Sequence, residues 1–227
     1  MPDGFFTDKN GVVHPINNRG SKKGGGGGAA VAAVALAGLA AAGGGFTSAS
    51  PVGEAAESVV QKTISDKVEN AKRTARQGKD EESWVRLGLK ELKKATRADL
   101  DCVVNSSGQV RQFFIRTPCR SLKRWLVPFV DTHGDIIVLS IAWLEMYDDD
   151  NADRLKRLDD TYGTGSVLAL PDEVAGLIGI RFPGQHYDSR QEGSLVVIAE
   201  ATAGTGHPDV ALMDGVAHVA KELPAPR

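Results

Sequence analysis

Several signatures of common enzyme classes are missing from this chain of 227 residues. The sequence contains no C-x-x-C pair and also lacks H-E-x-x-H, Walker and G-x-S-x-G motifs. These gaps argue against a zinc ribbon, a thiol redox site, a zinc protease, a P-loop nucleotide site and a hydrolase of the nucleophile-elbow type. We therefore expect neither an enzyme nor a bound cofactor.

A strong net charge is absent as well. The formal charge is −2 at pH 7, which does not favour nucleic acid as a partner. The charge is unevenly divided, because residues 97–227 hold thirteen basic and nineteen acidic side chains. Hydrophobic residues make up 41% and charged residues 25% of the chain, a composition typical of a protein with a packed core.

One stretch, from Gly24 to Ser50, contains no charged residue. Its apolar centre, residues 29–46, would measure about 27 Å as a helix, against a hydrocarbon core of about 30 Å. Lys22 and Lys23 precede the stretch and acidic residues follow it, so the positive-inside rule predicts a cytoplasmic N-terminus. We expect a single-pass membrane anchor.

Two other interpretations of this stretch stay open. Residues 29–42 fit the apolar region of a cleaved export signal with an A-x-A sequence at its end. A Gly/Ala linker in a cytosolic protein is the other interpretation. The apolar residues at 5–7 and 12–13 flank a turn and predict a small β-hairpin, which favours a retained head over a discarded signal.

Only two cysteines are present, Cys102 and Cys119. They bracket a stretch whose pattern predicts a strand, a turn and a second strand, at about 101–105 and 109–116. A disulfide between them would close a loop of about 18 residues and add about 3 kcal/mol of stability in the chain-entropy model. Such a bond agrees with export of this half of the chain, because disulfides persist in oxidising compartments. Two unrelated buried thiols are the alternative.

A helical region follows Pro51 and carries one narrow apolar stripe. The stripe consists of Val60, Ile64, Val68, Ala71 and Ala75. Such a stripe suits a stalk that either self-associates as a coiled coil or lies on the domain. Gly78 ends this helix, and a second helix is predicted at about 80–95.

The chain becomes rich in strand-forming residues from Leu100 onward. Strands are predicted at about 101–105, 109–116, 124–130, 135–146, 176–182 and 194–201, and helices at about 150–161 and 208–222. The pattern predicts an α+β domain with a mainly antiparallel sheet and helices packed on one face. Four parts follow, namely a cytoplasmic head at 1–23, a membrane segment at 24–50, a helical stalk at 51–96 and an extracytoplasmic domain at 97–227.

Three segments carry a resemblance to other proteins. In chain order they are "TPCRSLKRWLV", "DDTYGTGSVLALP" and "GQHYDSRQEGSLVVIAE". Following an Ala/Gly-rich span, they resemble segments of uncharacterised single-pass membrane proteins from high-GC Gram-positive bacteria. The resemblance covers about residues 100–222 and implies an envelope location, without implying any catalytic residue.

The segment "GQHYDSR" is the leading candidate for ligand binding. Its candidate residues are Gln185, His186, Tyr187, Asp188 and Arg190. They are predicted to lie in a loop between two strands, where binding groups often gather. The structural alternative has Tyr187 packed on the sheet and Asp188 paired with Arg190. Close neighbours in sequence cannot converge as a Ser-His-Asp relay, so a hydrolase that uses His186 is the least favoured interpretation.

Three other clusters are interpreted as structural. Asp131, His133 and Asp135 are predicted to form a hairpin turn, so no metal site is expected there. The sequence "GTGS" at 163–166 follows a helix and precedes a strand, which favours helix termination over a phosphate loop. The basic run at 120–124 is predicted to lie on a solvated edge strand.

These observations predict a membrane-anchored envelope protein with an extracytoplasmic binding or scaffold domain. Residues 29–46 would contact the membrane, the partner would be an unidentified protein or envelope ligand, and the stalk would offer a surface for self-association. Two alternatives come from other classes. One is a soluble cytosolic partner-binding protein with a Gly/Ala hinge, and the other is the hydrolase.

Overall fold

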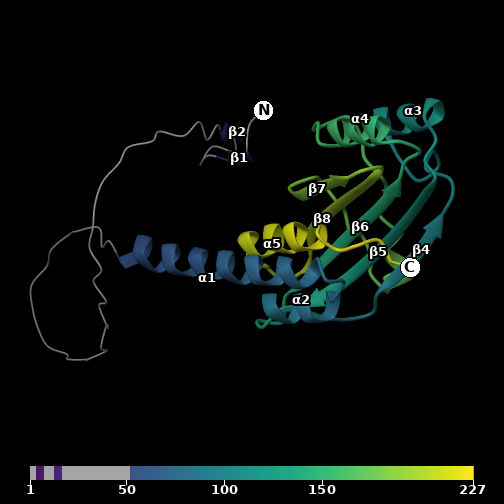
Figure 1. Ribbon diagram of the computed structural model, residues 1–227. Coiled ribbons are helices and arrows are strands. Elements are labelled where there is room, and N and C mark those ends of the chain that lie inside the picture. Colours follow the sequence, from purple (N-terminus) through teal and green to yellow (C-terminus); the bar gives the residue numbers. More distant parts are fainter. Residues whose placement is uncertain (1–3, 8–12, 17–51, 227) are drawn as a thin grey trace, which may run out of the picture. The chain divides into compact units, whose positions relative to one another are not determined.

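The computed structural model describes residues 4–7, 13–16 and 52–226 of the chain (Figure 1). The predicted membrane segment, residues 24–50, lies outside these described residues. Within the described part, no helix is both long and apolar enough to cross a membrane.

The chain forms two compact units. The first, Met1–Ser48, contains strands β1 (Gly4–Thr7) and β2 (Val13–Ile16), which pair antiparallel and confirm the predicted hairpin. The second, Ala49–Arg227, is an α+β fold built on an antiparallel sheet, as the sequence predicts.

A six-stranded antiparallel sheet forms the centre of the second unit. The strand order is β3-β5-β6-β8-β7, and β4 also pairs with β5. The strands are β3 (Lys90–Glu91), β4 (Ala95–Asp99), β5 (Ser121–Val130), β6 (Ile136–Glu145), β7 (His186–Glu192) and β8 (Leu195–Thr205). The strands predicted at 124–130, 135–146 and 194–201 are confirmed as β5, β6 and β8.

The central strands are apolar on both faces of the sheet. On β6, Ile137, Leu139 and Ile141 belong to one core cluster, whereas Val138 and Leu144 belong to clusters on the other face. A strand of this kind has to be covered from both sides, because water would otherwise contact one apolar face. Helices pack on both faces, so the prediction of helices on a single face is wrong.

Three helices cover one face of the sheet (Figure 1). They are α1 (Val52–Ala75), α2 (Asp80–Leu87) and α5 (Val210–Ala220). The predicted stripe on α1 belongs to the core of this face through Ile64, Val68, Ala71 and Ala75. The C-terminal part of α1 therefore lies on the domain, and α5 confirms the helix predicted at 208–222.

The second predicted helix ends earlier than expected. Helix α2 stops at Leu87, because Gly88 takes φ +83° and its N–H approaches the carbonyls of Trp84 and Val85. The chain then enters β3 and β4, so the prediction of helix up to residue 95 is wrong. Glycine in the left-handed region is a common helix terminator, and apolar spacing beyond Gly88 concealed it.

The opposite face is covered by two helices, a 3₁₀ helix and a long connecting segment. The helices are α3 (Gly108–Arg116), α4 (Asp149–Asp159) and the 3₁₀ helix η1 (Asp172–Ala175). Helix α4 confirms the prediction and is capped by Asp148, whose carboxylate accepts the Asn151 N–H at 2.7 Å. The strand predicted at 109–116 is wrong, because burial of Val110 and Phe114, four residues apart, favours helix.

Other predicted strands also differ from the structure. Residues 101–105 form a turn, and residues 176–182 form no strand. Strand β7 occupies a segment predicted as a loop. Its sequence, HYDSRQE, has no apolar alternation, so its extended conformation depends on pairing with β8.

The "GTGS" segment supports the N-terminus of α3. The Thr164 carbonyl accepts the Gln109 N–H at 2.6 Å. A Cβ on Gly165 would overlap the backbone carbonyl of Ser107, and Gly165 also has φ +91°. Close backbone approach therefore explains Gly165, in addition to the helix termination that the sequence predicts.

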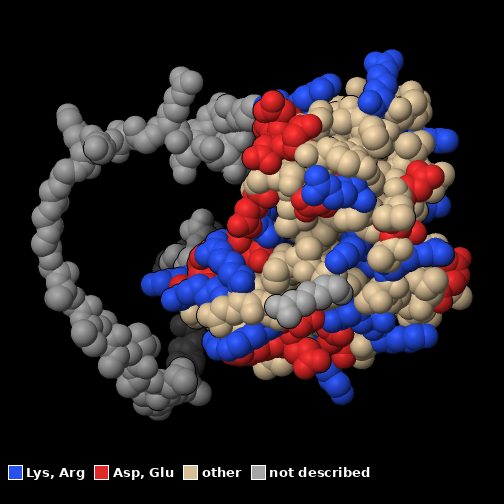
Figure 2. Space-filling view, turned by 45° about the vertical axis from the view of Figure 1, so that its right-hand side comes forward, with Lys and Arg blue, Asp and Glu red and all other residues tan. Residues whose placement is uncertain are grey.

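The surface charge is mixed. Figure 2 shows basic and acidic side chains interspersed over the face in view, with uncharged surface between them. Several opposite charges are paired, such as Arg86 with Glu82 at 2.6 Å and Arg76 with Glu222 at 2.9 Å. On the face shown in Figure 2, acidic side chains gather in several small groups with basic side chains between them.

Candidate functional site

The predicted ligand-binding residues lie mainly on β7, an edge strand, and not in a loop. Strand β7 pairs with β8 and lies between α4 and α5 (Figure 1). Successive side chains of a strand point to opposite faces, which divides the candidates into two groups. Those that contact α5 or its C-terminal cap are His186, Asp188 and Arg190, and those that contact the end of α4 are Tyr187 and Ser189. Gln185 precedes the strand and is exposed.

On the α5 side, the polar side chains of β7 have oppositely charged or hydrogen-bonding partners. His186 Nδ1 lies 2.7 Å from Asp214 Oδ1. Asp188 Oδ2 lies 2.6 Å from Lys221 Nζ and 2.5 Å from His218 Nδ1. These pairs fasten α5 to the edge of the sheet.

Asp188 is held in its charged form. Burial opposes its ionisation, but hydrogen bonds from His218 and Lys221 outweigh burial and lower the pKa of Asp188. Its second oxygen accepts the backbone N–H of Ser189 at 2.8 Å. Arg190 donates to the backbone carbonyl of Lys221 at 2.8 Å, which adds a further contact to the end of α5.

On the α4 side, carboxyl groups gather around one tyrosine. The Tyr187 hydroxyl lies 2.8 Å from Asp159 Oδ2 and 2.9 Å from Asp160 Oδ1. The Ser189 hydroxyl donates to the same oxygen of Asp160 at 2.5 Å. Glu200 of β8 is the register partner of Tyr187, so the two residues share a face of the sheet. We refer to Asp159, Asp160, Tyr187 and Glu200 as the acidic cluster.

Burial dominates the electrostatics of the acidic cluster. Asp159 is 7% exposed, and burial raises its pKa to about 6. The pKa of Glu200 rises to about 7, first through burial and also through the charge of Asp159, although the Gly184 N–H opposes the shift. Burial and the two adjacent aspartates raise the pKa of the Tyr187 phenol. Burial therefore disfavours ionisation of Asp159, Glu200 and Tyr187, in contrast with Asp188.

Sequence reasoning missed the partners of β7. Asp214, His218 and Lys221 are spaced by four and three residues, so a polar stripe along α5 was a usable signal. Glu200 was a weaker signal, as an acid between two alanines in a predicted apolar strand. The acids at 159–160 had no signal, because only the fold brings the end of α4 to Tyr187.

Most of the residues predicted to bind a ligand, or to act in a hydrolase, already have partners within the chain. His186 and Asp214 form an imidazole–carboxylate pair. Within the described residues, no Ser, Thr or Cys side chain hydrogen-bonds to this imidazole. A ligand at His186 Nδ1, Tyr187 or Asp188 would have to displace an intramolecular partner, whereas Gln185 is exposed.

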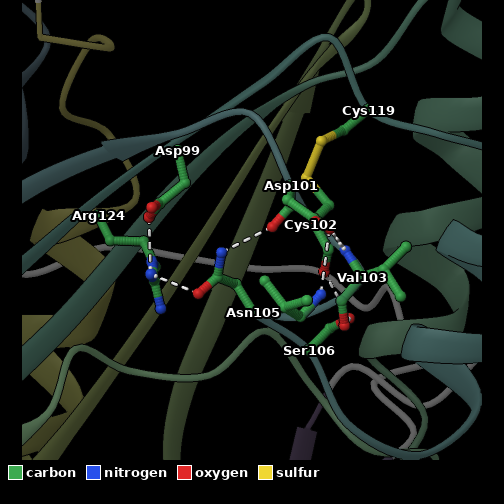
Figure 3. Close-up of a disulfide and its surroundings, with 9 residues drawn as sticks. Asp99, Asp101, Cys102, Val103, Asn105, Ser106, Cys119 and Arg124 are labelled. Carbon is green, nitrogen blue, oxygen red and sulfur yellow. Dashed lines mark hydrogen bonds and ion pairs between the residues drawn. A yellow bond between two sulfur atoms is a disulfide. The ribbon is translucent and has the colours of Figure 1, made fainter.

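Cys102 and Cys119 form a disulfide, with Cα atoms 6.2 Å apart (Figure 3). Both cysteines are buried, at 3% and 7% exposure. This is the bond that the sequence predicts, but the closed loop contains α3 and not a hairpin. The disulfide ties the turn before α3 to the chain that follows the helix.

Hydrogen bonds organise the turn around Cys102 (Figure 3). The Asp101 carboxylate accepts the Val103 N–H at 2.9 Å. The Asn105 side chain donates to the Asp101 carbonyl at 2.6 Å, and the Ser106 hydroxyl donates to the Cys102 carbonyl at 2.7 Å. The side chains of this turn therefore satisfy its own backbone groups.

Arg124 lies beside this turn and is only 4% exposed (Figure 3). Its guanidinium contacts Asp99 Oδ2 at 2.7 Å, Asn105 Oδ1 at 2.7 Å and the Leu168 carbonyl at 2.9 Å. The prediction of a solvated edge strand at 120–124 is wrong, because β5 lies between β6 and the pair β3 and β4. A buried cation of this kind needs such partners to offset its lost hydration.

The "DTHGD" sequence forms the predicted hairpin turn. Asp131 Oδ1 accepts the backbone N–H groups of His133 at 2.8 Å and of Asp135 at 2.9 Å. Gly134 has φ +89°, which suits a tight turn. Over the described range of the chain, no group of three or more His, Cys, Asp or Glu residues is arranged to hold a metal ion.

The chain matches no family model, no curated protein and no solved structure.

Proposed function

We propose that this chain is a membrane-anchored envelope protein whose α+β domain lies outside the membrane. The observation that carries the proposal is the Cys102–Cys119 disulfide. Disulfides form and persist in oxidising compartments and are rare in the cytosol. The charge-free stretch from Gly24 to Ser50, with Lys22 and Lys23 before it, supports an anchor with a cytoplasmic N-terminus.

We further propose that the domain binds or scaffolds another envelope component and is not an enzyme. The edge of β7 supports this part, because an edge strand offers unpaired backbone groups to a partner. Gln185 lies exposed at the start of that edge. The ion pairs between β7 and α5 hold this surface in one conformation before a partner arrives, which lowers the entropic cost of binding.

Fractionation combined with intact-mass measurement tests the anchor. The full chain is produced with a C-terminal tag, membranes are washed with carbonate, and thiols are trapped by acid quenching before alkylation under denaturing conditions. We expect the complete mass in the washed membranes, with Cys102 and Cys119 protected from alkylation. A complete chain in the supernatant with two alkylated thiols would overturn the proposal in favour of the soluble cytosolic alternative.

A third outcome identifies export without an anchor. A shortened chain that begins after the Ala-rich region and carries an intact disulfide would indicate a cleaved signal.

A matched pair of variants separates insertion from general effects of added charge. Leu36→Arg should release the chain from membranes, because arginine at the centre of a span costs about 2.5–3.5 kcal/mol, whereas Ser48→Arg should not.

A further inference from the structure

The acidic cluster has more short oxygen–oxygen contacts than hydroxyl hydrogens. Tyr187 carries one hydroxyl hydrogen but lies within 2.9 Å of oxygens from both Asp159 and Asp160. Asp160 already receives the Ser189 hydroxyl and lies 2.5 Å from Lys156 Nζ. A proton on Asp159 supplies the missing hydrogen, because Asp159 can then donate to the Tyr187 oxygen.

The environment of the second oxygen of Asp159 also favours the protonated form of this residue. Asp159 Oδ1 is buried and has no hydrogen-bond partner. Ser166 and the Val167 backbone lie close enough to oppose the rise in the pKa of Asp159, but neither makes a hydrogen bond of normal geometry to Oδ1. An unpartnered oxygen is far more costly on a buried carboxylate than on a neutral carboxyl group.

The surroundings of Asp159 offer little compensation for a negative charge. The groups that face the cluster are Asp160 and Lys156 from α4, Tyr187 from β7, Glu200 from β8 and the Gly184 N–H from the segment before β7. His186, on the other face of β7, acts weakly on Glu200. Among the described residues, no Lys, Arg or His forms an ion pair with Asp159.

Thr164 links the C-terminal end of α4 to the N-terminus of α3 through hydrogen bonds. Asp159 is the last residue of α4, and the Thr164 hydroxyl donates back to the Leu158 carbonyl at 2.7 Å. The Thr164 carbonyl in turn accepts the Gln109 N–H at the start of α3. A change at Asp159 therefore reaches both the segment at 160–185 and the N-terminus of α3.

We propose that protonation of Asp159 controls how firmly the segment at 160–185 is held on the domain. With a proton, Asp159 binds Tyr187 and keeps the end of α4 against β7. Without it, the buried carboxylate is expelled toward water and the segment loosens. This inference goes beyond the proposed function and holds for the domain in any compartment.

The direction of the effect follows from burial. The folded-state pKa of about 6 lies above the ordinary value of 3.8 for aspartate, so the closed form binds the proton more tightly than the open form. The stabilising effect is complete below the ordinary pKa and is lost as the pH rises through the folded-state pKa. Between pH 5 and pH 7.5 these two values correspond to about a tenfold increase in the opening equilibrium constant.

Hydrogen exchange measured by mass spectrometry tests the proposal on the full-length chain in detergent micelles. Peptides from 160–185 are compared with peptides from β6 at pH 5 and pH 7.5, after correction for the intrinsic exchange rate. We expect opening of 160–185 to increase about tenfold at the higher pH, with β6 unchanged. Equal opening at both pH values would overturn the proposal.

Variants test whether Asp159 is the residue that causes the pH dependence of exchange. In a Glu200→Gln background, which removes the other acid of the cluster with a raised pKa, Asp159→Asn keeps the shape of a neutral carboxyl group and should abolish the pH dependence. Asp153→Asn is the matched control, because Asp153 lies on the same helix with 46% of its side chain exposed and pairs with Arg157. If Asp159→Asn retains the tenfold change and Glu200→Gln removes it, the proposal for Asp159 is wrong.

Tyr187→Phe provides an independent measurement that keeps the aromatic ring. By this proposal the Tyr187 oxygen accepts a hydrogen bond from protonated Asp159, so removal of the hydroxyl should move the midpoint of the exchange transition to lower pH. A midpoint that stays in place, or moves to higher pH, would show that Tyr187 does not stabilise the protonated form of Asp159.

Discussion

Strand β7 packs against α5 with one face and against α4 with the other. The buried acidic residues on the two sides differ in the direction of their pKa shifts. Towards α5, Asp188 lies 2.6 Å from Lys221, and its pKa is lowered despite burial. Towards α4, burial raises the pKa of Asp159 to about 6 and of Glu200 to about 7. The partners of a buried acid on or beside β7 therefore decide whether that acid stabilises the fold when charged.

The two faces of the sheet also differ in what holds their helices in place. The face of α1, α2 and α5 has a single large apolar core cluster. The face of α3 and α4 has smaller clusters, and it also holds the disulfide and the buried Arg124 network. We infer that the second face depends more on specific polar and covalent links, and the following predictions test that difference.

Removal of the disulfide should have the largest effect. Replacing both cysteines, Cys102→Ser with Cys119→Ser, should lower the free energy of unfolding by about 3 kcal/mol, because the unfolded chain regains the entropy of the closed loop. Hydrogen exchange should show a greater loss of protection in α3 than in α5. Reduced wild-type protein is the control and should behave alike. An unchanged denaturation midpoint would contradict the assignment.

The second-largest effect is expected at Gly165, whose backbone lies close to the backbone of Ser107. Gly163 and Gly165 have φ +86° and +91°, but only a Cβ at Gly165 meets backbone atoms. Gly165→Ala should therefore lower the free energy of unfolding by about 2 kcal/mol more than Gly163→Ala. Urea denaturation of both variants measures the difference. Equal effects would mean that backbone conformation alone explains the two glycines.

Asp188→Asn should be destabilising at pH 7, by about 2 kcal/mol, because charged hydrogen bonds to Lys221 and His218 are lost. The folded-state pKa of Asp188 lies below 3.8, so its contribution is present above that pH and is lost as the pH falls further. Unfolding measured from pH 7 to pH 2 should show a constant difference in stability between variant and wild type above pH 3.8 and a shrinking difference below it. A gap that widens in acid would be the wrong sign.

His186→Ala should have the smallest effect, a loss of at most about 1 kcal/mol, because its partner Asp214 is 44% exposed. Thermal unfolding at low and high salt measures it, and the loss should shrink at high salt. His133→Ala is the matched control, since that side chain is 83% exposed, and it should leave stability unchanged. A loss well above this range would mean that His186 has a structural role not seen in its contacts.

Much of the fold was predictable because burial imposes a period on the sequence. The apolar runs of β5, β6 and β8 and the amphipathic helices α4 and α5 were found in this way. Strand β7 and helix α3 were missed for opposite reasons. Strand β7 is polar throughout, and α3 is short and rich in residues such as Val110 and Phe113 that also favour strands.

The candidate site was predictable in part. The sequence singled out the residues of β7, but it did not reveal that strand geometry would send His186 and Tyr187 to opposite faces. The disulfide was predictable because the chain has only two cysteines, although the helix between them was not. Partners such as Asp214 and Asp159 lie 28 residues from the β7 side chains that they contact.

By itself, the sequence determined the α+β class, the central strands, several helices and the single available cysteine pair. Only the tertiary structure decided that helices cover both faces, and which acids receive a cation and which are buried without one. The physical reason is range. Hydrophobic periodicity acts over a few neighbouring residues, whereas desolvation and ion pairing depend on groups that meet only after the chain has folded.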